Sequence, residues 1–308
     1  MVVVEKTAST VVISAEKKIS LAAVPFFLAK NFVTHLAELW LYRDLLRNLV
    51  MRDLKVRYRN SVLGVLWSFG NPLLMMLVFT LVFTIMTGYS NVKAFPVFIL
   101  CAILPWNFFS ASVIGAIRSI VDNASLVNKV YFPRELLPIS IVLANMVNFL
   151  VALIVLFVFI LIFQIPLTGW VGLLPFVVLL QVIFTMGMAL IMATANVFYR
   201  DTQIIMEVVM LAWFFVTPIF YPVEILPRNY ELEVLNMTLT FDVWRWVNIL
   251  NPMASIIATY RVILYGVGYG GAAPEFYFFM RTLLTSTAAL LAGGYIFHRS
   301  SSRFAEEV

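Results

Sequence analysis

Between residues 39 and 55, apolar and polar side chains repeat with the period of an α-helix. One face of this stretch is apolar and carries Leu39, Tyr42, Leu45, Leu46, Leu49 and Val50. The opposite face is polar and mostly basic and carries Arg43, Asp44, Arg47, Asn48, Arg52 and Lys55. Asp53 interrupts the apolar stripe. One apolar and one basic face are typical of a helix that lies in a membrane interface, and we expect this amphipathic helix over residues 35–60.

Beyond this helix, long apolar runs alternate with short polar segments. No Lys, Arg, Asp or Glu occurs between residues 60 and 92, a stretch long enough for a helix to cross a bilayer. We expect six transmembrane helices, at about residues 64–87, 95–121, 139–163, 171–198, 204–221 and 276–297. Pro72 and Pro105 should kink the first two, because proline removes a backbone hydrogen bond. The predicted fold is an all-α polytopic membrane protein with its six-span domain within residues 61–303.

The composition supports a membrane protein and excludes a soluble one. The 308 residues are 62% hydrophobic and only 12% charged, whereas soluble domains carry about 25% charged residues. Continuous apolar runs also exclude a membrane β-barrel, whose strands alternate. The net charge of +5 comes from basic residues beside the spans, so we expect contact with anionic lipids and no nucleic acid. The single cysteine, Cys101, lies in an apolar run and is expected to be a packing residue.

The distribution of basic residues predicts the orientation in the membrane. Segments on one side carry the N-terminal basic cluster and Lys129, Arg134, Arg200, Arg299 and Arg303, whereas the short loops on the other side carry only Lys93. The positive-inside rule therefore predicts cytoplasmic tails at residues 1–34 and 304–308. The outer segment of residues 223–275 contains two apolar pieces, at 243–250 and 253–265, that are too short to cross. We expect two re-entrant helices there, with a pair of surface amphipathic helices as the alternative.

No pattern in the sequence indicates catalysis, a metal site or a phosphate-binding loop. A carrier driven by an ion gradient usually keeps a charged group at mid-membrane, but Arg118, Glu207 and Arg281 all lie near span ends. The energy for any active transport must therefore come from a partner. The loop of residues 122–138 is a candidate docking site, because it places two aromatic residues beside an ion pair. An ordinary loop with its aromatic residues among lipid headgroups is the alternative.

Five short motifs occur in the order seen in one family of transporters. They cover residues 52–74, 130–138, 196–201, 217–222 and 248–253. With this order and spacing, the chain resembles the permeases of type-2 ABC exporters, above all the branch that exports polysaccharides such as O-antigen, capsule and teichoic acid. The resemblance extends over about residues 39–303.

The resemblance implies a half-transporter of a bacterial plasma (inner) membrane. Two copies of the chain would form the pore, and two cytoplasmic ABC ATPase subunits would bind ATP and Mg²⁺, so this chain needs no cofactor and is not itself an enzyme. The substrate would be a glycan carried on undecaprenyl diphosphate. The resemblance also implies a coupling site for the ATPase, made of Asn128, Lys129, Tyr131, Phe132, Pro133, Arg134 and Glu135, with a second contact at Arg200 and Asp201.

Two further sets of residues fit a lipid-linked glycan. Aromatic faces pack against the apolar faces of sugar rings, and we expect a substrate channel that includes Trp67, Phe79, Phe83, Trp106, Phe108, Phe109, Trp213 and Phe214. Arg52, Arg57 and Arg59 are candidates for contact with the lipid diphosphate, although topology alone would also explain their charge. A drug or small-molecule exporter of the same fold, or a non-transporting membrane scaffold, remains the alternative function.

Overall fold

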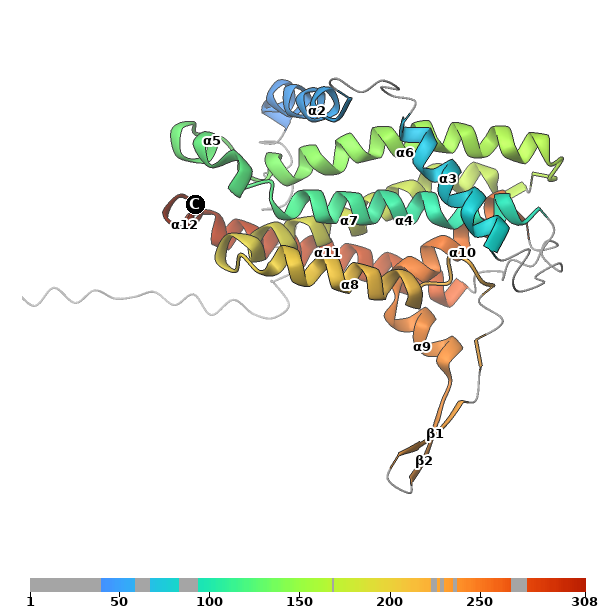
Figure 1. The fold of residues 1–308 in the computed structure, drawn as a ribbon. Helices are drawn as coiled ribbons and strands as arrows, with labels where there is room; N and C mark the ends of the chain where they lie inside the picture. Colours follow the sequence, from blue (N-terminus) through green and yellow to red (C-terminus); the bar gives the residue numbers. More distant parts are fainter. Residues whose placement is uncertain are drawn as a thin grey trace, which may run out of the picture. The chain divides into compact units, whose positions relative to one another are not determined.

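The computed structural model describes residues 40–58, 67–82, 94–167, 169–222, 226–227, 230–234, 237–266 and 276–308. The chain divides into two compact units, Met1–Arg43 and Asp44–Val308, and the elements below belong to the second unit apart from the first residue of α2. Helices make up most of the described chain (Figure 1). In order they are α2 (Arg43–Tyr58), α3 (Trp67–Leu81), α4 (Phe95–Ile117), η4 (Val121–Asn123), α5 (Ala124–Lys129), α6 (Leu136–Ile162), η5 (Gly169–Leu173), α7 (Leu174–Phe198), α8 (Thr202–Val216), α9 (Val243–Leu250), α10 (Pro252–Leu264), α11 (Phe276–Ser301) and α12 (Phe304–Glu307).

Helices occupy each of the six positions where the sequence predicts a span. Three of them are long and apolar enough to cross a membrane: Phe95–Ile117, Leu136–Ile162 and Gly169–Phe198. The helices at the first and fifth positions, α3 and α8, are apolar but have only 15 residues each within the described chain. Helix α11 has 26 residues but contains Arg281 and several Ser, Thr and Gly residues, which lower its apolar content. A helical membrane protein with more than one span is therefore confirmed, and the count of six stays a prediction.

The amphipathic helix forms as predicted, over Arg43–Tyr58. Leu49 is buried and Leu45, Leu46 and Val50 are half-buried, while the basic residues Arg47, Arg52 and Lys55 are exposed. The period of 3.6 residues that marked the apolar stripe in the sequence therefore corresponds to the face that packs onto the protein.

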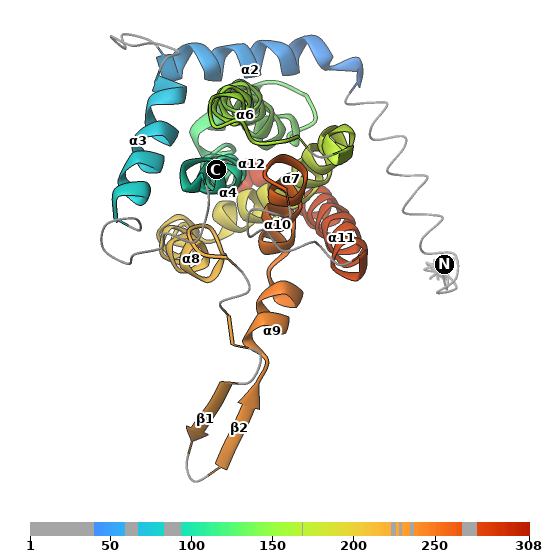
Figure 2. The same ribbon diagram turned by 90° about the vertical axis from the view of Figure 1, so that its right-hand side faces the viewer.

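Helix α4 forms the core of the second unit. The residues from Val97 to Ile103 are at most 1% exposed, because α3, α6, α7, α8 and α10 all pack against this helix (Figure 2). Its apolar span is 78% buried, whereas that of α6 is only 33% buried and leaves one face for lipid. The helix continues through Pro105, whose carbonyl accepts a hydrogen bond of 2.7 Å from Gln181 Nε2 in α7.

The segment between α8 and α10 contains a feature that the sequence analysis did not predict. Strands β1 (Tyr230–Val234) and β2 (Met237–Phe241) pair in an antiparallel hairpin, with Tyr230 opposite Phe241 and Val234 opposite Met237. Both segments alternate apolar and polar residues, which is the period of a strand. Helices α9 and α10 then occupy the two predicted short apolar pieces. Helix α10 is largely buried against α4, α7 and α11, whereas α9 exposes Trp246 and Leu250; re-entry into the membrane stays a prediction.

Helices α7 and α11 make the most extensive contact between any two described helices. Gly187 and Gly293 allow their backbones to approach closely, as small residues do in membrane helix pairs. A Cβ atom at Gly187 would overlap the backbone of Ala289 and would lie 2.5 Å from the nitrogen of Leu290. Neither backbone can move away without a shift of the whole helix.

We predict that Gly187→Ala lowers the free energy of unfolding by about 1–3 kcal/mol, the usual cost of overpacking. The measurement is denaturant or thermal unfolding of the purified chain in detergent. Gly294→Ala is the matched control, since nothing lies within 4 Å of a Cβ atom at that position. Equal stability of the two variants would contradict the close approach of α7 and α11.

Candidate functional site

The turn between α5 and α6, residues 130–135 (the α5–α6 turn), exposes its first residues. Tyr131 is 98% exposed and Val130 is 51% exposed, and Asn128 and Lys129 at the end of α5 are exposed as well. An almost fully exposed tyrosine between two helices is uncommon for a residue that contributes to folding. These four residues are therefore free to contact a partner.

The second half of the α5–α6 turn faces the protein itself. Phe132 is buried at 9% exposure. Arg134 donates a hydrogen bond from Nη1 to the carbonyl oxygen of Ser301, at the end of α11. Glu135 Oε1 lies 3.8 Å from Nδ1 of His298. The predicted coupling residues thus divide into an outward group and a group that contacts the C-terminal end of the chain.

The turn between α7 and α8, residues 199–201 (the α7–α8 turn), lies at the same end of the helices as α5. Helix α12 contacts both α5 and α7 there (Figure 1). Tyr199 is 73% exposed, and Arg200 and Asp201 are exposed. The hydroxyl of Thr202 donates to the carbonyl of Tyr199 at 2.6 Å, which closes the turn tightly. The predicted second contact therefore presents its charged residues to the surroundings.

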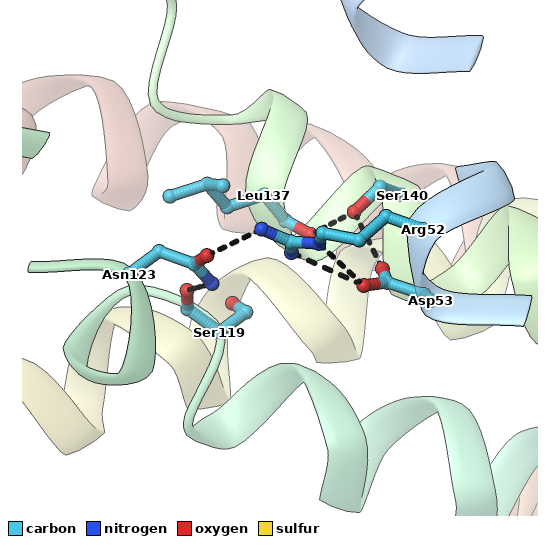
Figure 3. A network of polar contacts seen from close by, with 6 residues as sticks. All are labelled: Arg52, Asp53, Ser119, Asn123, Leu137 and Ser140. Atoms are coloured by element: carbon cyan, nitrogen blue, oxygen red, sulfur yellow. Dashed lines mark hydrogen bonds and ion pairs between the residues drawn. The ribbon is translucent and has the colours of Figure 1, made fainter. Parts of the chain in front are cut away.

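A polar network joins the amphipathic helix α2 to Asn123, which precedes α5 in the chain, and to Ser140 of α6, the helix that follows α5 (Figure 3). Arg52 donates to Asn123 Oδ1 at 2.9 Å, and Asn123 lies directly before α5. The Arg52 guanidinium also pairs with Asp53 at 3.1 Å. The hydroxyl of Ser140, in the first turns of α6, donates to Asp53 Oδ2 at 3.2 Å. Asp53, which interrupts the apolar stripe of α2, thus has a defined polar partner on α6.

The three arginines predicted to contact a lipid diphosphate have different surroundings. Arg52 belongs to the network above and keeps a 41% exposed side chain. Arg57 donates to the side chain of Asn145 in α6 at 2.8 Å. Arg59 lies outside the described residues. The two described guanidiniums therefore already have partners within the chain, and contact with a diphosphate stays a prediction.

Most of the described aromatic residues predicted to line a channel meet in one aromatic cluster, formed by α3, α4 and α8. Its members are Phe79, Trp106, Phe109, Trp213 and Phe214. The ring centroids of Trp106 and Phe214 lie 5.7 Å apart, and those of Phe109 and Trp213 lie 5.2 Å apart. Trp106 and Phe109 are buried, whereas Trp213 and Phe214 are half-buried. The cluster therefore reaches the surface along α8.

Of the remaining predicted channel residues, only Phe108 has a described side chain, and it contacts another ring. Phe108 stacks on Phe149 of α6 at 5.2 Å, on another side of α4. Phe83 lies outside the described residues, and so does the side chain of Trp67, the first residue of α3. Phe215, an aromatic residue of the same predicted span as Phe214, is 56% exposed on α8, and its ring centroid lies 5.4 Å from that of Phe214.

Two polar side chains, from Asn251 at the N-cap of α10 and from Arg261 within α10, make hydrogen bonds to residues at and beyond the end of α8. Asn251 Oδ1 accepts from Trp213 Nε1 at 2.9 Å, and its amide donates to the hydroxyl of Thr217 at 2.8 Å. Arg261 is 4% exposed, lies 3.6 Å above the ring of Phe98, and donates to the carbonyls of Pro218 and Ile219 at 2.7 and 2.5 Å. The sequence analysis assigned no role to Arg261.

We predict that Asn251→Ala lowers the free energy of unfolding by about 1–3 kcal/mol, because it leaves the Trp213 indole N–H and the Thr217 hydroxyl without this partner in a buried place. Trp213 fluorescence and thermal unfolding in detergent are the measurements. Asn251→Ser keeps an oxygen for the helix cap at Ala254, so its loss should be smaller. Wild-type stability of both variants would show that the junction bonds contribute nothing.

Comparison with known proteins identifies the family of the chain. The family model described as "ABC-2 type transporter" matches residues 44–265. The O-antigen export system permease protein RfbA of Myxococcus xanthus is 38% identical over 271 residues, which cover 88% of this chain and 98% of that protein. A protein of the same name from Klebsiella pneumoniae is 30% identical over 264 residues, covering 85% and 94%. The resemblance inferred from the five motifs is confirmed, and the chain belongs to the ABC-2 type transporter family.

Proposed function

We propose that this chain is the membrane subunit of an ATP-driven exporter that moves an O-antigen-type polysaccharide, carried on a lipid diphosphate, to the outer face of a bacterial plasma membrane. The observation that carries the proposal is the similarity over nearly the whole length to two permeases named for O-antigen export. The matched stretches cover 88% and 85% of this chain.

The aromatic cluster supports a carbohydrate substrate. Trp213, Phe214 and Phe215 are three consecutive aromatic residues near the end of α8, the first two half-buried and the third exposed. Aromatic faces attract the C–H faces of sugar rings without fixing any one hydroxyl pattern. Such a surface suits a polymer that must slide, whereas a small charged substrate would need fixed ionic partners. We infer that these aromatic residues of α8 from two copies of the chain lie across the channel from each other.

The exposed turns support docking of an ATPase. Tyr131 and Tyr199 present large side chains at the end of the protein that carries α5 and α12, next to Lys129 and Arg200. Exposed aromatic and basic residues are the types that dominate protein interfaces. Two cytoplasmic ATPase subunits, one for each copy of the chain, would bind there, and both termini of the chain would then be cytoplasmic.

The proposed function is tested by reconstitution of the chain in liposomes, with and without its ATPase and with lipid-linked glycan on the cytoplasmic leaflet. We expect ATP-dependent appearance of glycan on the other leaflet only when both proteins are present. Translocation by the chain alone would overturn the proposal. A preference for small drugs over glycan would favour the drug exporter, and the absence of any flux would favour the scaffold.

We further predict that Tyr131→Ala weakens binding of the ATPase by about ten-fold or more, the loss expected for a hot-spot aromatic. Its 98% exposure means that unfolding of the isolated chain should not change. Co-purification and substrate-stimulated ATP hydrolysis are the measurements. Trp170→Ala is the control, because Trp170 is also exposed, at 62%, but lies in η5 between α6 and α7. Undiminished binding in the Tyr131 variant would remove the docking assignment.

If Arg52 and Arg57 bind the lipid diphosphate, Arg52→Gln and Arg57→Gln should raise the KM for the glycan by about ten-fold and leave kcat largely unchanged. Arg47→Gln, on the exposed face of α2, serves as the control. Lower stability with an unchanged KM would instead assign both arginines to their contacts with Asn123 and Asn145 alone.

A further inference from the structure

The C-terminal end of the chain packs against the protein as a helix, α12. Phe304 is fully buried, with its ring centroid 5.1 Å from that of Phe297 in α11 and 6.1 Å from that of Phe198 in α7. The guanidinium of Arg303 lies 5.3 Å above the ring of Phe198. Phe198 directly precedes the α7–α8 turn. The C-terminal helix and the residue before it therefore pack on Phe198, directly before that turn.

The end of α11 holds the α5–α6 turn in the same region. Arg134 donates to the carbonyl of Ser301, the last residue of α11. The last carbonyls of a helix have no partner within it and carry its partial negative charge, so a guanidinium there is doubly favourable. His298 and Glu135 form a second contact, with 3.8 Å between Nδ1 and Oε1. Helix α12 also contacts α5 itself.

These contacts connect two turns that lie far apart in the sequence. One leads from the α5–α6 turn through Arg134 to Ser301, and the other from Phe304 to Phe198 and the α7–α8 turn. Only two residues separate Ser301 from Phe304. Residues 298–304 therefore connect, over a short stretch of chain, the end of α11, which contacts the α5–α6 turn, to Phe304, which packs beside the α7–α8 turn. The exposed residues of both turns, Tyr131 and Tyr199, lie outside these contacts.

We propose that the C-terminal segment of residues 298–308 is a bracket that fixes the spacing between the α5–α6 turn and the α7–α8 turn, with Phe304 as its positioning residue. A single ATPase subunit that contacts both turns would then move them as one body. The movement would pass into α7 and α11, whose backbones already pack without room for a Cβ atom at Gly187. The spacing is a property of this chain, and only its use by an ATPase rests on the proposed function.

The bracket is tested by a distance measurement between the two turns. Spin labels at Ser125→Cys in α5 and Tyr199→Cys, both exposed positions, report this distance in the full chain after Cys101→Ala removes the native cysteine. We expect one narrow distance distribution in this background. Phe304→Ala should broaden it at least two-fold, and Phe304→Leu, which keeps an apolar side chain, should restore most of the narrow distribution. Glu306→Ala, an exposed residue of the same helix, is the control and should change nothing.

A distribution in the Phe304→Ala variant that matches the wild type would overturn the bracket. If that variant does not fold, Arg303→Ala provides the same test, because Arg303 is exposed and its removal deletes only the contact over Phe198. A distance distribution in Arg303→Ala as narrow as that of the wild type would then overturn it.

Transport measurements separate the bracket from a purely structural role. With a bracket, Phe304→Ala should still bind the ATPase but should hydrolyse several-fold more ATP for each glycan moved, and Phe304→Leu should recover the wild-type ratio. A variant that only loses stability would lower the amount of active protein without changing this ratio. A wild-type chain that recruits no ATPase would overturn the proposed function and leave the distance result untouched.

Discussion

Where a helix ends among other apolar helices, nearby backbone carbonyls have no partner within a helix and need hydrogen bonds from elsewhere. This requirement governs the arrangement of the protein. Neither lipid nor an apolar core can supply a hydrogen bond, and an unpaired group costs several kcal/mol. At the end of α8, Arg261 of α10 donates to the carbonyls of Pro218 and Ile219, and Asn251, the N-cap of α10, donates to Thr217. Gln181 of α7 donates to the carbonyl of Pro105 in α4 and accepts from Tyr260 of α10 at 2.9 Å. Polar contacts therefore fix α10 both to the end of α8 and, through Gln181, to α7 and α4.

The polar contacts at the two ends of the protein differ in how much they contribute to stability. Arg261 is almost fully buried, and removal of a partner from a buried charge typically costs about 3–5 kcal/mol. At the other end, Arg52 is 41% exposed and His298 is 63% exposed, and such surface pairs contribute about 0–1 kcal/mol each. Because this contribution is close to the thermal energy, these exposed ion pairs can break and form again readily. These exposed ion pairs at the end that carries α5 and α12 are therefore weaker than the buried contacts of Arg261 at the junction of α8 and α10.

The sequence predicted those features that depend on local periodicity. The period of 3.6 residues located α2 and its buried face, apolar runs located the longer helices, and short apolar pieces located α9 and α10. It did not predict that Phe132 is buried beside an exposed Tyr131, or that Arg134 bonds to the end of α11, more than 160 residues later. The hairpin was missed because each strand has only five residues, too few for its alternation to stand out. Residues 304–308 were expected to form a tail, since a four-residue helix has no period to detect.

Asp53 shows how a local irregularity in a sequence can indicate a contact. An acidic residue in the apolar stripe of an interfacial helix weakens its binding to lipid, so a membrane anchor alone gives no reason for it. In the structure, Asp53 accepts from Ser140 on α6 and pairs with Arg52, which in turn holds Asn123 before α5 (Figure 3). The same guanidinium cannot bind a diphosphate with all its donors while it makes these bonds. A diphosphate at Arg52 would therefore compete with Asn123 and Asp53 for the same guanidinium.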